Sequence, residues 1–254
     1  MKRMTGILCC GVAAALLILA AGCGPNTVDE CLNAGAAYGA NGDWKKALKM
    51  AERAESLSEN SVPALVLRAI AHEKLGERDL ALDAARQAAT LNPESFVAQY
   101  TLGRLYAADP TRYSDALAPL TRAAKLRNFR DRNTLILLAN TTAALRSPSA
   151  GNWLNFLVRV APEIGSDPAY RNLLGIVLTR ARKLDSARQE FTQAYQQDRS
   201  NPMVVYNIGV FFDRYAANPR AGRQFYQAFL RLAGDDPQYA DLKSRVSAQL
   251  TQMR

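Results

Sequence analysis

The chain has 254 residues, with 32 lysines and arginines against 23 aspartates and glutamates, and a formal net charge of +9. This length is long for one globular domain and ordinary for an array of repeats, while the charge balance favours attraction to anionic surfaces. A single histidine, His72, argues against histidine-based metal sites and catalytic triads.

The first 22 residues have the plan of a secretory leader. Lys2 and Arg3 form a positive start, residues 4–22 are almost wholly apolar, and the small residues "AAG" precede Cys23. The ending "AAGC" resembles a bacterial lipobox, and that resemblance implies that residues 1–22 are removed and that Cys23 carries diacylglyceryl and acyl (palmitate) groups. The alternative is an uncut membrane anchor, because about 20 apolar residues can span a bilayer. The small residues before Cys23 favour cleavage.

A short tether, residues 23–27, follows the cut. Thr27 is placed to cap a helix, with Glu30 three residues later as its capping-box partner, so the folded body should begin almost at the lipid. Gly24 follows the cysteine where an aspartate would favour retention in the inner membrane. By resemblance to bacterial sorting signals, this predicts an outer-membrane lipoprotein that faces the periplasm.

Internal repeats occupy the next two hundred or so residues. The segments "LLGIVLTRARKLDSARQEFTQA" and "YNIGVFFDRYAANPRAGRQFYQA" place a glycine, aromatic residues and alanines at identical offsets, 34 residues apart. "GAAYGANGDWKKALKMAERA" and "LGRLY" carry parts of the same pattern. Such spacing predicts antiparallel helix pairs in which a small residue of the first helix meets an alanine of the second. Neither helix buries its apolar face alone, so neighbouring pairs must stack.

These residues resemble the tetratricopeptide repeat family, which implies an all-α, right-handed superhelical solenoid. We expect about six units over residues 28–235, starting near Val28, Val62, Phe96, Arg132, Pro168 and Pro202. The fourth unit is the weakest, because "SPSAG" interrupts the register of its second helix, and five regular repeats with one irregular pair remain an alternative. One inserted residue is expected in the turn at 109–113.

Residues 236–254 are expected to form a helix that caps the open end of the array. Its apolar residues, Tyr239, Leu242, Val246 and Leu250, recur at helical spacing. The domain plan is thus leader 1–22, tether 23–27, repeats 28–235 and capping helix 236–254, which leaves no length for a catalytic domain.

Catalytic and metal-binding motifs are missing from the sequence. There is no HExxH, no Cys-x-x-Cys after the leader, no GxSxG and no phosphate loop, so we expect neither an enzyme nor a cofactor nor a metal. His72 is interpreted as a helix-packing residue, and Cys31 as a small buried hydrophobic residue.

The resemblance places a binding groove on the concave face, lined by the first helix of each unit. The corresponding residues are Leu32 and Ala36 in the first unit, followed by Val66, Ile70, Tyr100, Arg104, Ile136, Asn140, Asn172, Ile176, Tyr206 and Val210. One turn further come Glu73, Thr179, Arg180, Asp213 and Arg214. This mixed set favours a partner segment with apolar side chains over an acidic C-terminal peptide. The alternative is that these residues only complete packing between layers.

Positive charge gathers in the second part of the chain. Residues 23–95 carry 8 basic and 11 acidic residues, whereas residues 96–254 carry 22 basic and 12 acidic. A basic patch for anionic lipid, cell-wall polymer or an acidic partner would comprise Arg122, Lys125, Arg127, Arg130 and Arg132. A solvated helix face is the alternative that we favour. Nucleic acid is not expected, because no aromatic stacking platform accompanies the charges.

Together these features predict a lipid-anchored scaffold or adaptor of the bacterial envelope, which binds another envelope protein or peptide segment and no small-molecule substrate. In length, repeat count and lipobox the chain resembles the pilotin lipoproteins that help pilus secretins to assemble. An accessory subunit of outer-membrane barrel or cell-wall machinery is a further alternative. Architecture alone does not separate these functions.

Overall fold

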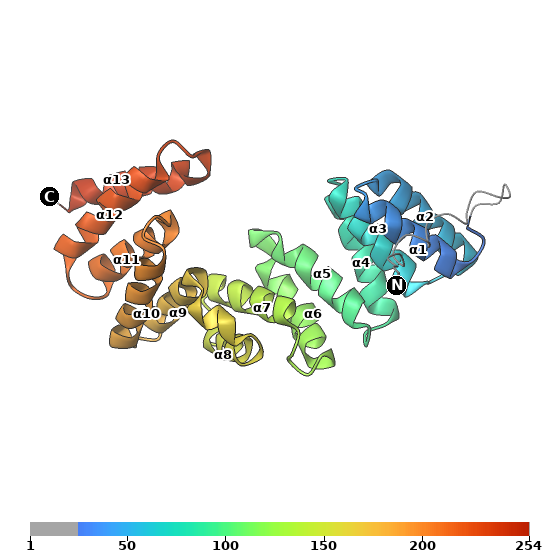
Figure 1. Cartoon of the computed structure of the whole chain (residues 1–254), viewed down its shortest axis with the longest axis horizontal. Helices are drawn as coiled ribbons and strands as arrows, with labels where there is room; N and C mark the ends of the chain where they lie inside the picture. Colours follow the sequence, from blue (N-terminus) through green and yellow to red (C-terminus); the bar gives the residue numbers. More distant parts are fainter. Residues whose placement is uncertain (1–24, 254) are drawn as a thin grey trace, which may run out of the picture.

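The computed structural model describes residues 25–253, which contain thirteen α-helices, three short 3₁₀ helices and no β-strand. The predictions for the leader and for Cys23 lie outside the described residues. No helix in residues 25–253 is long and apolar enough to cross a membrane. The helices form an elongated array, with the first pair and the last helix at opposite ends (Figure 1).

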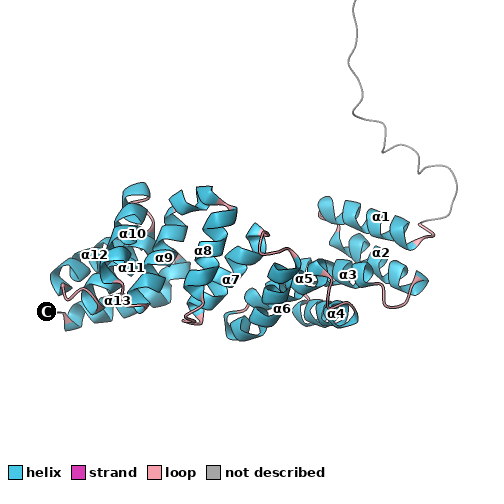
Figure 2. Cartoon of the chain, turned by 90° about the horizontal axis from the view of Figure 1, so that it is seen from below, coloured by secondary structure: helices cyan, strands magenta, loops and turns pink. Residues whose placement is uncertain are grey.

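Twelve of the helices form six antiparallel pairs that stack side by side along the array (Figure 2). The first helices are α1 (Val28–Ala40), α3 (Val62–Lys74), α5 (Phe96–Ala107), α7 (Arg132–Ala144), α9 (Pro168–Arg180) and α11 (Pro202–Arg214). The second helices are α2 (Trp44–Leu57), α4 (Arg78–Leu91), α6 (Tyr113–Leu126), α8 (Ala150–Val160), α10 (Leu184–Gln197) and α12 (Pro219–Ala233). The all-α solenoid with about six pairs is therefore confirmed.

Local signals in the sequence fix where the first helices begin. The Thr27 hydroxyl accepts from the backbone N–H of Glu30, whose carboxylate accepts from the N–H of Thr27, so the expected capping box is present. Asp131 and Asn201 cap α7 and α11 in the same way with their side-chain oxygens. Each cap pairs backbone N–H groups that would otherwise lack a partner in the first helical turn.

The third and fourth pairs contain the irregularities. A 3₁₀ turn, Pro110–Arg112, lengthens the connection inside the third pair, where one inserted residue is expected. Asn128 and Phe129 both have positive φ and form a wider turn before α7. In the fourth pair α8 has only 11 residues, and a second 3₁₀ segment, Pro162–Ser166, follows it. The fourth unit is thus a helix pair with a shortened second helix.

Close contact within a pair depends on glycines in the first helix. A Cβ added at Gly175 would lie 2.7 Å from Cε1 of Phe191, and one added at Gly209 would lie 2.7 Å from Cδ1 of Tyr226. The expectation that alanines face these glycines is wrong at these positions. The aromatic ring of the second helix fills the space instead, because it covers more apolar surface than a methyl group.

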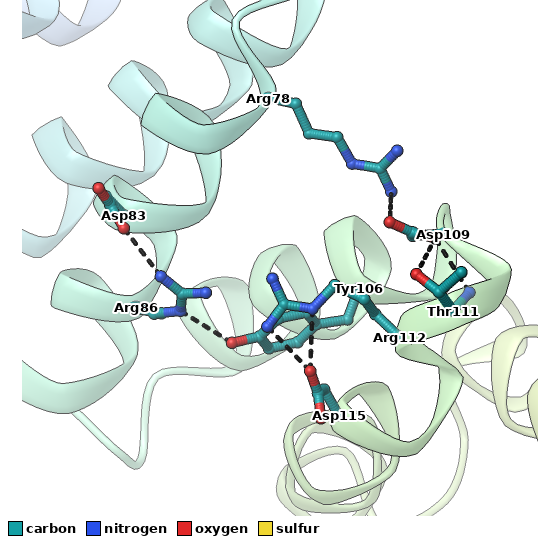
Figure 3. A network of polar contacts seen from close by, with 8 residues as sticks. All are labelled: Arg78, Asp83, Arg86, Tyr106, Asp109, Thr111, Arg112 and Asp115. Atoms are coloured by element: carbon teal, nitrogen blue, oxygen red, sulfur yellow. Dashed lines mark hydrogen bonds and ion pairs between the residues drawn. The ribbon is translucent and has the colours of Figure 1, made fainter.

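A polar network joins the second and third pairs (Figure 3). Nε of Arg86 donates to the Tyr106 hydroxyl over 2.9 Å, and the guanidinium of Arg112 lies 4.5 Å from the centroid of the Tyr106 ring. Arg78 also pairs with Asp109 over 3.3 Å. The arginines of this junction are therefore engaged with neighbouring side chains and hold α4 against α5 and the 3₁₀ turn.

The last helix, α13 (Ala240–Gln252), covers the open end of the sixth pair. Val246 is 2% exposed, and the expected apolar residues Tyr239, Leu242 and Leu250 pack in the same cluster. The Tyr239 ring stands edge-on to Phe229 of α12, with centroids 6.0 Å apart. The helix so covers apolar surface that a seventh pair would otherwise bury, which is the expected role of a terminal cap.

Candidate functional site

The first helices of the last two pairs and α13 enclose the larger of two neighbouring cavities. Its volume is about 480 Å³, and three of the expected groove residues line it: Ile176 of α9 and Tyr206 and Val210 of α11. Val246 and Gln249 of α13 form its far wall. The capping helix therefore closes the array and also shapes the groove.

A smaller cavity of about 150 Å³ lies between α7 and α9. The expected groove residues Ile136 and Asn140 line it, together with Arg132 from the predicted basic patch. Its floor is formed by Leu154 and Leu157, both almost completely buried. This cavity could hold one apolar side chain of a partner segment, with polar groups at its rim.

The N-terminal half of the expected groove is occupied by its own contacts. Val66 is 6% exposed and packs in the core with Ile70, so its side chain is not open to a partner. Arg104 makes two hydrogen bonds of 2.6 Å to the carboxylate of Glu73, and this carboxylate raises the pKa of Arg104. Tyr100 stacks on Phe96 at 5.7 Å, and burial raises its pKa.

Asn172 links two first helices and does not line either cavity. Nδ2 of Asn207 donates to Oδ1 of Asn172 over 3.1 Å, which joins α11 to α9. Asn207 itself lines the larger cavity. The amide pair therefore holds the two helices that carry the cavity walls.

The five residues of the predicted basic patch do not form one surface. Arg122 and Lys125 lie on α6 beside a shallow depression, whereas Arg127 covers the ring of Phe96 at 4.5 Å. Arg132 lies at the smaller cavity and 3.5 Å from a carboxylate oxygen of Glu163. Arg130 is exposed in the turn before α7. These separate positions agree better with solvated helix faces and turns.

Four arginines line the larger cavity: Arg146, Arg180, Arg214 and Arg245. Sequence reasoning placed Arg180 and Arg214 near the groove but missed Arg146 and Arg245. Arg146 lies in the turn after α7 and Arg245 lies on α13, so neither follows the register of the first helices. Only the equal spacing of Arg146, Arg180 and Arg214, 34 residues apart, could have suggested the set.

Reactive groups in the described residues are engaged in packing. Asp213 accepts from the Tyr226 hydroxyl over 3.2 Å and from Nε2 of Gln249 over 3.1 Å. Burial, with the nearby Asp213 charge, raises the pKa of Tyr226. His72 is 8% exposed and contacts a Glu77 oxygen at 2.6 Å. Residues 25–253 hold no group of three potential metal ligands.

Comparison with solved structures places the chain among tetratricopeptide-repeat folds. YrrB, described as a TPR protein with an unusual peptide-binding site, has a TM-score of 0.59 and 19% identity, over 76% of this chain and 97% of its own. PilF of Pseudomonas aeruginosa has a TM-score of 0.61 and 16% identity, over 86% of this chain and 97% of its own. PilW, described as a widely conserved type IV pilus biogenesis factor, gives 0.62 and 16%, over 86% and 98%.

The likeness lies in the fold. No family model matches the sequence, and no curated protein matches it. The chain therefore has the architecture of a tetratricopeptide-repeat array, a class in which the first helices of successive pairs present one continuous face.

Proposed function

We propose that this protein is a lipid-anchored adaptor of the bacterial envelope that holds a segment of a partner protein in the C-terminal half of its concave groove. The observation that carries the proposal is the pair of neighbouring cavities along α7, α9 and α11. Two such cavities in a row suit an extended or helical segment whose side chains enter both. The N-terminal half, whose polar groups are already paired, would act as a rigid spacer.

The membrane part of the proposal rests on the sequence around Cys23. Helix α1 begins at Val28 with a complete capping box, so little chain separates the lipidated residue from the folded array. Two acyl chains would anchor the protein stably. The short tether would then hold the array close to the outer membrane, on its periplasmic side.

A pilotin-like assembly factor is the second candidate. It is favoured by the similarity to PilF and PilW, each of which matches along nearly its whole length. In that case the bound segment would belong to a pilus or secretion secretin. The main proposal and this one differ in the partner and share the groove.

The groove is tested by filling the smaller cavity. Asn140 is an exposed residue of α7 at this cavity, and Asn140→Trp should block it without disturbing the core. We expect in-cell crosslinking and mass spectrometry to show a partner enriched by the wild-type protein and depleted about tenfold by the variant, the equivalent of about 1.4 kcal/mol of binding free energy.

Gln193→Trp is the matched control, because Gln193 is exposed on the second helix α10 and lines neither cavity. It should leave the partner profile unchanged. Equal depletion by both tryptophans, or by neither, would move the interface away from this groove.

The anchor is tested by Cys23→Ser. We expect the variant to keep the helix content of the wild type and to move from the membrane fraction to the soluble fraction, because serine cannot receive the thioether-linked lipid. The measurement is fractionation after a carbonate wash, with labelled palmitate as a second readout. A variant that stays in the membrane would support the uncut anchor instead.

A further inference from the structure

The larger cavity brings together four guanidinium groups from separate parts of the chain. Arg180 ends α9, Arg214 ends α11, Arg245 lies on α13 and Arg146 lies in the turn after α7. All four line the same space of about 480 Å³. No aspartate or glutamate within residues 25–253 lines this space.

None of the four is paired with a carboxylate in the part of the chain that the structure describes. Elsewhere in the array arginines do have such partners, as Arg104 has Glu73 and Arg171 has Glu190 at 2.9 Å. Asp213 is the neighbouring acid, and its carboxylate already accepts from Tyr226 and Gln249. The cavity therefore carries a local excess of positive charge.

The charge of Arg180 is held in an unfavourable place. Partial burial, and then the nearby charge of Arg146, lower the pKa of Arg180 below its ordinary value. Its Nη1 donates to the carbonyl oxygen of Ala143, a neutral acceptor. An anion in the cavity would compensate both the lost hydration and the repulsion between the two arginines.

The backbone at Arg146 points in the same direction. Arg146 has φ of 56° in the turn between the two helices of its pair, and glycines occupy the corresponding turns of the first two pairs, Gly42 at 78° and Gly76 at 82°. A left-handed conformation disfavours any residue with a Cβ. The turn itself thus gains nothing from an arginine, and a role for the side chain would explain its presence.

We infer that the C-terminal half of the groove binds an acidic segment of a partner protein, with carboxylates received by Arg146, Arg180, Arg214 and Arg245. This inference rests on the proposed function and specifies the chemistry of the bound segment. Guanidinium groups match carboxylates in a planar, two-point geometry, so several in one cavity select for acidic side chains or a terminal carboxylate.

The surroundings favour a peptide over a membrane surface. Ile176, Val210 and Val246 line the same cavity, which suits a segment that alternates acidic and apolar side chains. The arginines surround a hollow between helices, where a flat bilayer could not meet all of them. This ligand differs from the apolar segment expected from the sequence, because two of the four arginines lie outside the repeat register.

The test uses purified full-length protein in detergent and a pool of short labelled peptides that combine glutamate or aspartate with leucine or phenylalanine. A matched pool carries glutamine and asparagine in place of the acids. Fluorescence anisotropy at about 0.15 M salt should show binding of the acidic pool and at least tenfold weaker binding of the amide pool. Arg180→Gln and Arg214→Gln should each weaken binding of the acidic pool by about tenfold.

Arg146→Gly and Arg182→Gly form a matched pair of variants. Arg182 has φ of 60° in the equivalent turn of the fifth pair but does not line the cavity. Both glycines should leave the melting temperature unchanged or higher, since glycine fits the turn. Only Arg146→Gly should weaken binding of the acidic pool, again by about tenfold.

Three results would overturn the inference: equal binding of the two pools, no binding of either, or binding of the acidic pool that the arginine variants do not change. Arginine-dependent binding of a soluble short-chain phosphatidylglycerol, with no binding of the peptides, would assign the cavity to a lipid headgroup instead. If Asn140→Trp still removes the cellular partner in any of these cases, the groove proposal stands without this ligand.

Discussion

Replacing Gly103 by alanine should lower the free energy of unfolding by about 2 kcal/mol. Gly103 lies on α5, and an added Cβ would stand 2.6 Å from Cγ and 3.1 Å from the backbone nitrogen of Leu120 on α6. Leu120 is 0% exposed within the main core cluster, so it has little room to move away. The two helices would have to separate, which weakens the packing of the third pair. Chemical denaturation followed by circular dichroism measures the effect.

Gly151→Ala is the control for this prediction. Gly151 lies in the first turn of α8, and the nearest atom to an added Cβ is Cγ1 of Val177 at 3.8 Å, an ordinary contact. Because alanine has the higher helix propensity, this variant should be neutral or more stable by up to about 1 kcal/mol. If both alanines have the same effect, close approach of α5 to α6 is not what requires Gly103.

The second large effect is expected for Phe229→Ala, at about 3–5 kcal/mol of destabilisation. Phe229 of α12 is 0% exposed, and its ring lies 5.4 Å from that of Tyr206 on α11 and 6.0 Å from that of Tyr239 before α13. Its removal leaves a cavity where three elements meet. In a repeat array each pair contacts only its neighbours, so the loss should be concentrated at the C-terminal end.

Hydrogen exchange measured by mass spectrometry can locate this loss. In Phe229→Ala, amides of α12 and α13 should exchange faster, while those of α1 to α4 should keep their protection. Leu232→Ala is the matched control, because Leu232 is on the same helix and 40% exposed, and it should change stability much less. Faster exchange along the whole array would contradict the nearest-neighbour explanation and show that the array unfolds as one unit.

Sequence patterns were sufficient for the architecture because they describe local events. The six first helices begin at Val28, Val62, Phe96, Arg132, Pro168 and Pro202, where the repeats were expected to start. Cap residues, first-turn prolines and a fixed apolar period act within one helix or one pair, so they can be read from neighbouring residues. The irregular fourth pair was anticipated for the same reason, because "SPSAG" interrupts the period.

The candidate site was only partly predictable. Ile136, Asn140, Ile176, Tyr206 and Val210 line the two cavities, as their position in the repeat suggests. Equivalent positions in the N-terminal half, Val66 and Arg104, are buried or ion-paired. Position in the repeat sets the direction in which a side chain points, and it does not set which neighbours occupy the space around it.

The sequence by itself thus determined the period, the helix pairs and the end at which a capping helix lies. Tertiary structure decided which charges are compensated. Arg104 meets Glu73 from the previous pair, whereas Arg146, Arg180, Arg214 and Arg245 share one cavity without a carboxylate on its wall. Helix formation depends on residues a few positions apart, but a charge in a groove is balanced by side chains that only stacking of the pairs and of α13 brings together.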